Sequence, residues 1–222
     1  MLEDVLLTFW MRFPFALLTV RFAVLLVSFT LHELAHGLTA ALLGDPTPSE
    51  SGRLTLNPFP HLESIGAITG LLLGFGWSRP MPIRPHRMRI PAWIGGPLAV
   101  LAGPLASMAL ALTGRGALQA LGLAPRWPWG GWPTLADFLS VLMRFNLTLA
   151  LLNTLPLFPL DAFTAIRFAL PLRTAAWWER ASGWTTALLG LGVALMFLLP
   201  ASWLRALIGP LMAWGLKVLW RQ

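Results

Sequence analysis

Long apolar stretches alternate along the chain with short polar segments that contain proline and glycine. The first stretch covers residues 15–43 and ends at Gly44-Asp45-Pro46-Thr47-Pro48, a run of helix-breaking residues. Further stretches cover residues 91–113, 134–152, 183–199 and 203–220. Each approaches the length of about 20 residues that a helix needs to cross a bilayer. The pattern predicts a polytopic α-helical membrane protein.

Three shorter segments have a different pattern. Residues 64–76 are apolar but reach only about half of a spanning length, and their four glycines suit a re-entrant or buried segment. Residues 51–61 are polar and partly alternating, whereas residues 77–85 contain three prolines that exclude a helix. We expect a short strand at the membrane surface from residues 51–61, and a second edge strand or a strand-like loop from residues 77–85. The predicted fold therefore has about five to six membrane segments, including the re-entrant one.

The whole chain, residues 1–222, is expected to form a single membrane-embedded domain. Its core covers about residues 15–170. A C-terminal helical hairpin, interrupted by Pro200, covers about residues 183–220. The sequence contains no internal repeat and no low-complexity tail that would suggest a different organisation.

The scarcity of charge supports this fold class and argues against an ordinary soluble protein. Charged residues make up 11% of the chain and hydrophobic residues 56%, whereas soluble domains are about one quarter charged. The net charge is +7, but no basic helix or aromatic-basic motif accompanies it, so nucleic acid is not an expected partner. Because cysteine is absent, a metal site would use histidine and carboxylate ligands.

The basic residues predict an orientation in the membrane. One side receives the larger group: Arg53, Arg79, Arg84, Arg87, Arg89, Arg167, Arg173, Arg180, Lys217 and Arg221. The other side receives Arg12, Arg115, Arg126 and Arg205. By the positive-inside rule, the loops around residues 44–63, 77–90 and 162–182 are cytoplasmic. We expect a multi-pass integral protein of a prokaryotic cell membrane, surrounded by the lipid bilayer; the sequence does not indicate an oligomeric state.

A His-Glu-x-x-His motif lies inside the first apolar stretch, at His32-Glu33-Leu34-Ala35-His36. On a helix, His32 and His36 project from one face about one turn apart, so both imidazoles can bind one zinc ion. Glu33 then lies beside the metal, where it can take a proton from metal-bound water. The alternative is a set of helix-end polar residues or of buried, hydrogen-bonded histidines. Because such residues inside a membrane are costly unless they pair or bind a metal, we favour the metal site.

Catalytic zinc commonly has three protein ligands and one open position, so a third ligand must come from elsewhere in the chain. Asp161 follows a segment in which Pro156 and Pro159 interrupt an apolar stretch and free backbone groups. A carboxylate at this place needs a partner such as a metal ion. His61 and His86 are alternatives, although their polar, proline-flanked loops favour a surface position.

Two further features of the apolar stretches predict contacts between helices. Ala99, Gly103 and Ser107 recur every four residues, which gives a face of small residues for close packing against another helix. Arg144 lies two helical turns from Asp137. These two residues form a structural pair, or Arg144 instead contacts substrate or lipid headgroups.

In combination, the motifs resemble those of the site-2 protease-like intramembrane metalloproteases, and the resemblance covers most of the chain. The His32 to His36 motif is similar to the zinc helix of that family, and Asn153-Thr154-Leu155-Pro156-Leu157-Phe158-Pro159-Leu160-Asp161 resembles its second signature. Three weaker segments follow the family's order: Gly52-Arg53-Leu54-Thr55-Leu56-Asn57-Pro58, Gly76-Trp77-Ser78-Arg79-Pro80-Met81-Pro82 and Ala102-Gly103-Pro104-Leu105-Ala106.

The resemblance implies an intramembrane zinc endopeptidase that hydrolyses a peptide bond in or near a transmembrane helix of a membrane protein substrate, in regulated intramembrane proteolysis. It implies one zinc ion (Zn2+) per chain, bound by His32, His36 and Asp161, with Glu33 activating the zinc-bound water. It also implies a small membrane-associated β-sheet near the active site, able to pair with an unwound substrate strand.

The resemblance assigns further residues to the substrate. The strand-pairing residues would be Arg53, Leu54, Thr55, Leu56 and Asn57, together with the stretch at 80–85. Asn153 would help to hold the substrate or the developing oxyanion. Alternatively, Asn153 forms a hydrogen bond between helices.

One residue departs from the family pattern, because Ala162 replaces the glycine that usually follows the aspartate. A methyl group could forbid a positive φ angle there, whereas a helical backbone would tolerate it. If Ala162 or a closed cavity prevented turnover, the chain would keep its zinc site and bind membrane proteins without cutting them. A metal transporter is a third alternative, but it would need polar ligands across the full membrane depth. The PDZ and CBS accessory domains of the family have no counterpart in the sequence.

Overall fold

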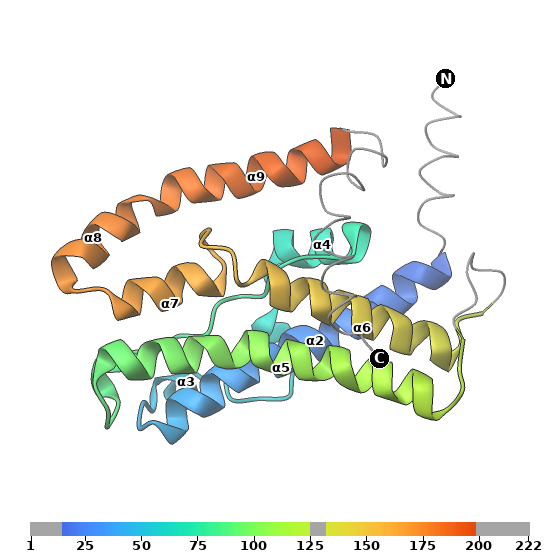
Figure 1. The fold of residues 1–222 in the computed structure, drawn as a ribbon, viewed down its shortest axis with the longest axis horizontal. Helices are drawn as coiled ribbons and strands as arrows, with labels where there is room; N and C mark the ends of the chain where they lie inside the picture. The colour runs from blue at the N-terminus through green and yellow to red at the C-terminus, as the bar shows by residue number, and fades with distance from the viewer. Residues whose placement is uncertain (1–14, 125–131, 199–222) are drawn as a thin grey trace.

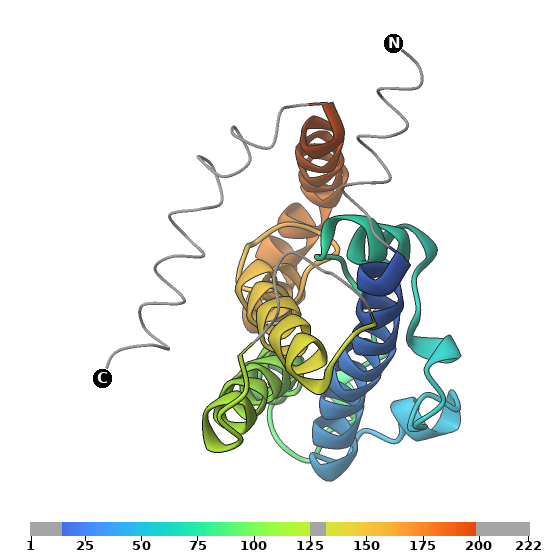
Figure 2. The ribbon, with the colours of Figure 1, turned by 90° about the vertical axis from the view of Figure 1, so that its right-hand side faces the viewer.

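Three long helices form the core of the computed structural model, which describes residues 15–124 and 132–198 (Figure 1). They are α2 (Phe15–Leu42), α5 (Ala92–Ala120) and α6 (Leu135–Leu152). The shorter elements are α3 (Thr47–Glu50), η1 (Phe59–His61), α4 (Ser64–Leu73), η2 (Pro85–Arg87), α7 (Asp161–Ala169), α8 (Leu172–Arg180) and α9 (Ser182–Leu198). Figures 1 and 2 show α2, α5 and α6 packed together, with α9 set apart from them.

Within residues 15–124 and 132–198, three helices are long and apolar enough to cross a membrane, at Leu17–Leu42, Ala92–Ala120 and Leu135–Leu152. The prediction of five to six membrane segments is therefore not supported by the described residues. The expectation for 64–76 is confirmed in its length, because α4 has only ten residues and a helix rises about 1.5 Å per residue. The second helix of the predicted C-terminal hairpin, at 203–220, lies outside the described residues.

Apolar side chains of α2 and α6 form the main core cluster. Val24, Leu25 and Phe29 of α2 are buried against Phe145 and Leu149 of α6. The rings of Phe29 and Phe145 lie 5.8 Å apart between centroids, within the range of favourable aromatic pairs. Inside a bilayer, such contacts stabilise the helix pair through van der Waals packing rather than through removal of apolar surface from water. Because a helical face repeats after three to four residues, the face with Phe29 continues directly into the His-Glu motif.

Of the two alternatives predicted for 77–85, the edge strand is wrong and the loop agrees with the structure, since the described residues contain no strand at all. This segment does run beside the loop at 51–61, but one backbone hydrogen bond joins the two in the described structure, from Arg79 N to His61 O at 2.8 Å. Proline has no N–H group, so Pro80, Pro82 and Pro85 cannot extend a ladder of hydrogen bonds. The predicted small β-sheet is consequently absent from the described part of the chain.

The predicted strand within 51–61 is replaced by tight turns. The Thr55 hydroxyl accepts a hydrogen bond from Asn57 N at 3.1 Å, and the Asn57 side-chain oxygen accepts one from Phe59 N at 3.2 Å. Short polar side chains that bond to nearby backbone in this way compete with strand pairing. The alternating polar and apolar residues of this segment therefore do not form the predicted strand.

Close backbone packing fixes the segment after α4. A Cβ on Gly66 of α4 would overlap with the carbonyl oxygen of Trp77, and a Cβ on Gly76 would overlap with that of Gly66. Only glycine permits such an approach of two backbones. As a result, residues 76–78 lie directly against α4, and Ser78 enters the candidate site from this direction.

The predicted pairing of Arg144 with Asp137 is not formed in the described residues. Asp137 instead belongs to a capping box at the start of α6, where its carboxylate accepts hydrogen bonds from the Thr134 N–H and hydroxyl at 2.9 and 2.7 Å. Such a box satisfies backbone donors at a helix N-terminus. Arg144 is exposed on the same helix.

Candidate metal centre

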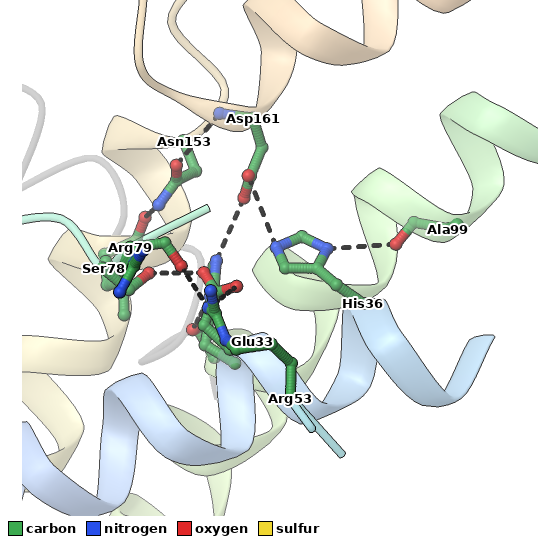
Figure 3. Close-up of polar contacts among 11 residues, drawn as sticks. Glu33, His36, Arg53, Ser78, Arg79, Ala99, Asn153 and Asp161 are labelled. Atoms are coloured by element: carbon green, nitrogen blue, oxygen red, sulfur yellow. Dashed lines mark hydrogen bonds and ion pairs between the residues drawn. The ribbon is translucent and has the colours of Figure 1, made fainter. Parts of the chain in front are cut away.

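His36 of α2 points toward Asp161, the first residue of α7 (Figure 3). His32, one turn earlier in α2, contacts the same carboxylate. The His32 Nε2 atom lies 3.0 Å from Asp161 Oδ2, and His36 Nε2 lies 3.3 Å from Asp161 Oδ1. The two imidazole rings are edge to face with centroids 4.7 Å apart. Ligand atoms of all three residues fall within 4.8 Å of one another, which places them where one metal ion can be held.

Asn153 sets the position of Asp161. It is the C-cap residue of α6, and its side-chain oxygen accepts a hydrogen bond from Asp161 N at 3.1 Å. Its backbone carbonyl accepts another from Ala162 N at 2.9 Å, while its side-chain nitrogen donates to Leu149 O at 2.9 Å. The proline-interrupted loop between α6 and α7 is thereby closed on itself. These bonds turn the start of α7 toward α2.

The other two candidate ligands are not brought to the site. His61 is fully buried, contrary to the expected surface position, and its Nε2 lies 2.9 Å from the Thr55 carbonyl oxygen. His86 is exposed. Among the described residues, the group that could hold a metal consists of His32, His36 and Asp161.

The predicted small-residue face of α5 packs against the two histidines, so that prediction is confirmed. The Ala99 carbonyl accepts a hydrogen bond from His36 Nδ1 at 3.0 Å, and His32 Nδ1 lies 2.9 Å from the Ser107 hydroxyl. Between them, a Cβ on Gly103 would lie 2.7 Å from His32 Nε2 and overlap with His36 Nε2. The missing side chain at Gly103 leaves room in front of both Nε2 atoms.

These residues fit a bound metal ion. Because His36 Nδ1 donates to a carbonyl, its Nε2 carries the lone pair that a metal needs. This Nε2 atom is buried, and its nearest polar neighbour is Asp161 Oδ1 at 3.3 Å, a carboxylate oxygen that offers no proton. Two acceptors that face each other at this largely buried place are costly unless a ligand between them satisfies both. Two imidazoles and one carboxylate with an open position are a donor set typical of catalytic zinc.

The charge around Asp161 suits the same purpose. Burial on its own would raise the pKa of the Asp161 carboxyl, but the neighbouring His36 and His32, when protonated, outweigh this effect and hold the pKa below its usual range. A metal cation bound by neutral imidazoles would act on the carboxyl in the same direction. A carboxylate that stays ionised is the form that binds a metal.

Glu33 projects from α2 beside this group and is buried, with 2% of its surface exposed. Its Oε1 atom accepts a hydrogen bond from the Ser78 hydroxyl at 2.7 Å, and its Oε2 atom lies 3.6 Å from Nη2 of Arg53 (Figure 3). The Arg53 guanidinium also donates to the carbonyls of Arg79 and Pro80 at 2.7 and 3.4 Å. Burial lowers the pKa of Arg53, and the Glu33 carboxylate opposes this effect.

A cavity of about 240 Å³ opens beside the metal group. Its wall includes His36 and Asp161, part of α7, and the extended residues 80–83. The cavity provides space for an extended peptide next to the candidate ligands.

Comparison with known proteins identifies a relative from Bacillus subtilis (strain 168), named "Putative zinc metalloprotease YwhC". The two chains are 38% identical over 163 residues, which cover 73% of this chain and 74% of the relative. The chain belongs to the family of this metalloprotease. No protein-family model matches the chain, and no solved structure matches it significantly.

Within this metalloprotease family member, the contacts of Glu33 are the part of the site that the sequence did not assign. Ser78 occurs in a loop, where its sequence position does not indicate a partner. Arg53 was expected to face a substrate strand, but its guanidinium points inward to Glu33. The burial of Arg53, which makes a nearby carboxylate necessary, becomes visible only in the fold.

Proposed function

We propose that this chain is an intramembrane zinc endopeptidase of the site-2 protease type, which hydrolyses a peptide bond in or next to a transmembrane helix of another protein. One observation supports this most directly. The histidines of the metal group and Glu33 lie within α2, a helix long and apolar enough to cross a membrane. Membership in a zinc metalloprotease family supports metal-dependent peptide hydrolysis.

Each polar side chain has a task in the proposed reaction. Nε2 of His32, Nε2 of His36 and the Asp161 carboxylate hold one zinc ion. Bound zinc supplies the Lewis acidity that makes water a stronger acid and polarises the scissile carbonyl. Glu33 accepts a proton as the water oxygen bonds to the carbonyl carbon, and it returns a proton to the leaving amine nitrogen as the C–N bond breaks. The Glu33 carboxylate is thereby regenerated.

The extended residues 80–83 are the proposed docking edge for the substrate. They border the cavity beside the metal group, and the backbone N–H groups of Met81 and Ile83 have no hydrogen-bond partner among the described residues. In an extended chain, residues two apart face the same side. A substrate helix that unwinds could pair with these groups, which would expose its scissile carbonyl. We propose that Arg53 to Asn57 support this edge rather than pair with the substrate themselves.

Asn153 and Ala162 enter the proposal as parts of the loop that holds Asp161. Because the Asn153 side chain already bonds to Asp161 N and to the Leu149 carbonyl, we propose that it positions the ligand. Ala162 lies in α7, and no non-glycine residue in the described part of the chain has a positive φ. Ala162 is therefore compatible with the helical backbone at this place, which supports the proposal that the chain cleaves its substrates.

The proposed reaction is tested in the purified full-length protein, reconstituted in liposomes with a panel of single-span transmembrane peptides. Glu33→Gln is expected to lower cleavage by at least about 1000-fold while the zinc content stays unchanged. Glu50→Gln is the matched control, because Glu50 is exposed and lies in α3. Cleavage by Glu33→Gln at the wild-type rate would refute the proposal.

Zinc content tests the ligand assignment independently of any substrate. Asp161→Ala is expected to purify without zinc, because two imidazoles alone bind the ion far more weakly. Glu179→Gln, which alters an exposed carboxylate of α8, serves as the control and should keep about one ion per chain. An Asp161→Ala protein with full zinc would exclude Asp161 as the third ligand.

The proposed orientation has a simple test, because the chain contains no cysteine. Single cysteines are introduced at Ser51 and at Leu121, which are exposed and lie beyond α2 and α5 respectively. An impermeant thiol reagent added to intact cells is expected to label the Leu121→Cys variant and to leave Ser51→Cys unlabelled. The reverse labelling would invert the proposed topology.

A further inference from the structure

The two carboxylate oxygens of Glu33 have different surroundings. Oε1 accepts a hydrogen bond from the Ser78 hydroxyl at 2.7 Å. Oε2 has no hydrogen-bond partner among the described residues, although it is buried. Nη2 of Arg53 lies 3.6 Å from Oε2, beyond the hydrogen-bond range of about 2.7–3.2 Å. The lone pairs of Oε2 therefore remain open.

Backbone carbonyl groups of the segment after Ser78 hold Arg53 beside Glu33. Its guanidinium is held by the carbonyl oxygens of Arg79 and Pro80, at 2.7 and 3.4 Å, and the residue is only 8% exposed. A buried carboxylate without an opposite charge is costly. Arg53 supplies that charge without occupying the lone pairs of Oε2. The same guanidinium holds the beginning of the extended segment at 80–83.

We infer that Ser78 and Arg53 are positioning residues for hydrolysis, and that Oε2 of Glu33 is the oxygen that accepts the proton. The inference rests on the proposed role of Glu33 as the base. Ser78 anchors Oε1 and so fixes the plane of the carboxylate, since the terminal torsion of a glutamate is otherwise broad. Arg53 balances the charge of the carboxylate and lies beside Oε2 at 3.6 Å.

The test uses the zinc-loaded full-length protein in liposomes, with a transmembrane peptide that the wild type cleaves. Ser78→Ala and Arg53→Met are each expected to lower kcat about 10- to 100-fold. The KM and the zinc content should stay within about twofold of the wild type. Ser78→Thr and Arg53→Lys, which keep the hydroxyl or the cation, are expected to recover part of the rate.

Arg79→Met is the matched control for charge. Arg79 is exposed, and its contacts with Arg53 and His61 use only backbone atoms. Replacement of its side chain removes one positive charge from the same segment and should leave kcat unchanged.

Wild-type kcat in Ser78→Ala and Arg53→Met would overturn the inference. A loss of zinc, or a rise in KM alone, would also overturn it, because either result would indicate a purely structural role. If Arg53→Met does not fold, Ser78→Ala and Ser78→Thr decide the question, because they change a single hydroxyl. An inactive Glu33→Gln with a fully active Ser78→Ala would refute this inference but not the proposed function.

Discussion

The metal centre has two sides that are built in different ways. The ligand side consists of His32, His36 and Asp161, and the face of α5 that contains Gly103 supports it. The other side, called the base side because Glu33 is the proposed base, consists of Glu33 with its partners Ser78 and Arg53, which come from loops. One helix, α2, serves both sides through adjacent residues. We therefore expect that substitutions beside the ligands weaken zinc binding, whereas substitutions beside Glu33 lower kcat while zinc is retained.

The largest effect is expected from Gly103→Ala, on the ligand side. The new methyl group would lie 2.7 Å from His32 Nε2 and overlap with His36 Nε2, and the backbone of a packed helix cannot move away cheaply. Zinc content should fall from about one ion per chain to near zero, as measured by elemental analysis of the purified protein. Gly116→Ala, on the same helix with nothing within 4 Å of its added methyl group, should keep its zinc. A full zinc content in Gly103→Ala would show that the ligand side does not depend on the space that Gly103 leaves.

A smaller effect is expected from Ser107→Ala, which removes the partner of His32 Nδ1. Loss of such a support typically weakens metal binding by about 10- to 100-fold. Competition with a chelator of known affinity measures the change. Ser140→Ala is the control, because Ser140 is also buried but bonds to its own helix at the Ala136 carbonyl. Equal affinities in the two variants would exclude Ser107 as a support of His32.

The ligand side could be predicted from the sequence because helices repeat regularly. A spacing of four residues is sufficient to place His32 beside His36, and the same spacing revealed the small residues of α5. Pro156 and Pro159 marked the segment before Asp161 as a break in an apolar stretch. The path of that loop cannot be predicted from the sequence, so the assignment of Asp161 as a ligand relied on the family resemblance. The path of the loop is determined by hydrogen bonds from Asp161 N and Ala162 N to Asn153, and these groups meet only in the folded chain.

The base side and the loops around it could not be predicted in the same way. Ser78 and Arg53 meet Glu33 across 45 and 20 residues of sequence, and no local period relates such positions. The strands predicted at 51–61 and 77–85 failed because prolines remove backbone donors, while Thr55 and Asn57 bond to their own loop. Among the fold predictions, α2, α5 and α6 agree with the apolar stretches, because span length is a property of the helix alone.

Gly66→Ala tests whether the base side can be disturbed without loss of zinc. The added methyl group would overlap with the Trp77 carbonyl oxygen, so the backbone next to Ser78 must shift. We expect kcat to fall about tenfold with zinc retained. Gly70→Ala in the same helix is the control, because its methyl group meets Leu25 Cδ1, the end of a flexible side chain. Loss of zinc in Gly66→Ala would show that the two sides are not separable.

The smallest effect is expected at the outer edge of the base side, where Arg87 of η2 pairs with Glu50 of α3 at 2.6 and 2.9 Å. The hydrogen bond from Arg87 lowers the pKa of the Glu50 carboxyl. A lowered pKa in the folded state means that the stabilisation is present at neutral pH and is lost as the pH falls through that lowered value. Glu50→Gln should therefore remove a small, acid-sensitive part of the thermal stability.

Neither zinc content nor kcat should change in Glu50→Gln, because the buried Asp45 already holds this segment through a hydrogen bond from Arg84 N at 2.6 Å. Unfolding midpoints of wild type and variant, measured from neutral to acidic pH, should converge at low pH, since exposed pairs contribute little. Arg87→Gln removes the same pair from the other partner and should behave alike. A fall in kcat in either variant would show that the base side depends on these exposed loops. η2 and α3 would then have to be counted as parts of the base side.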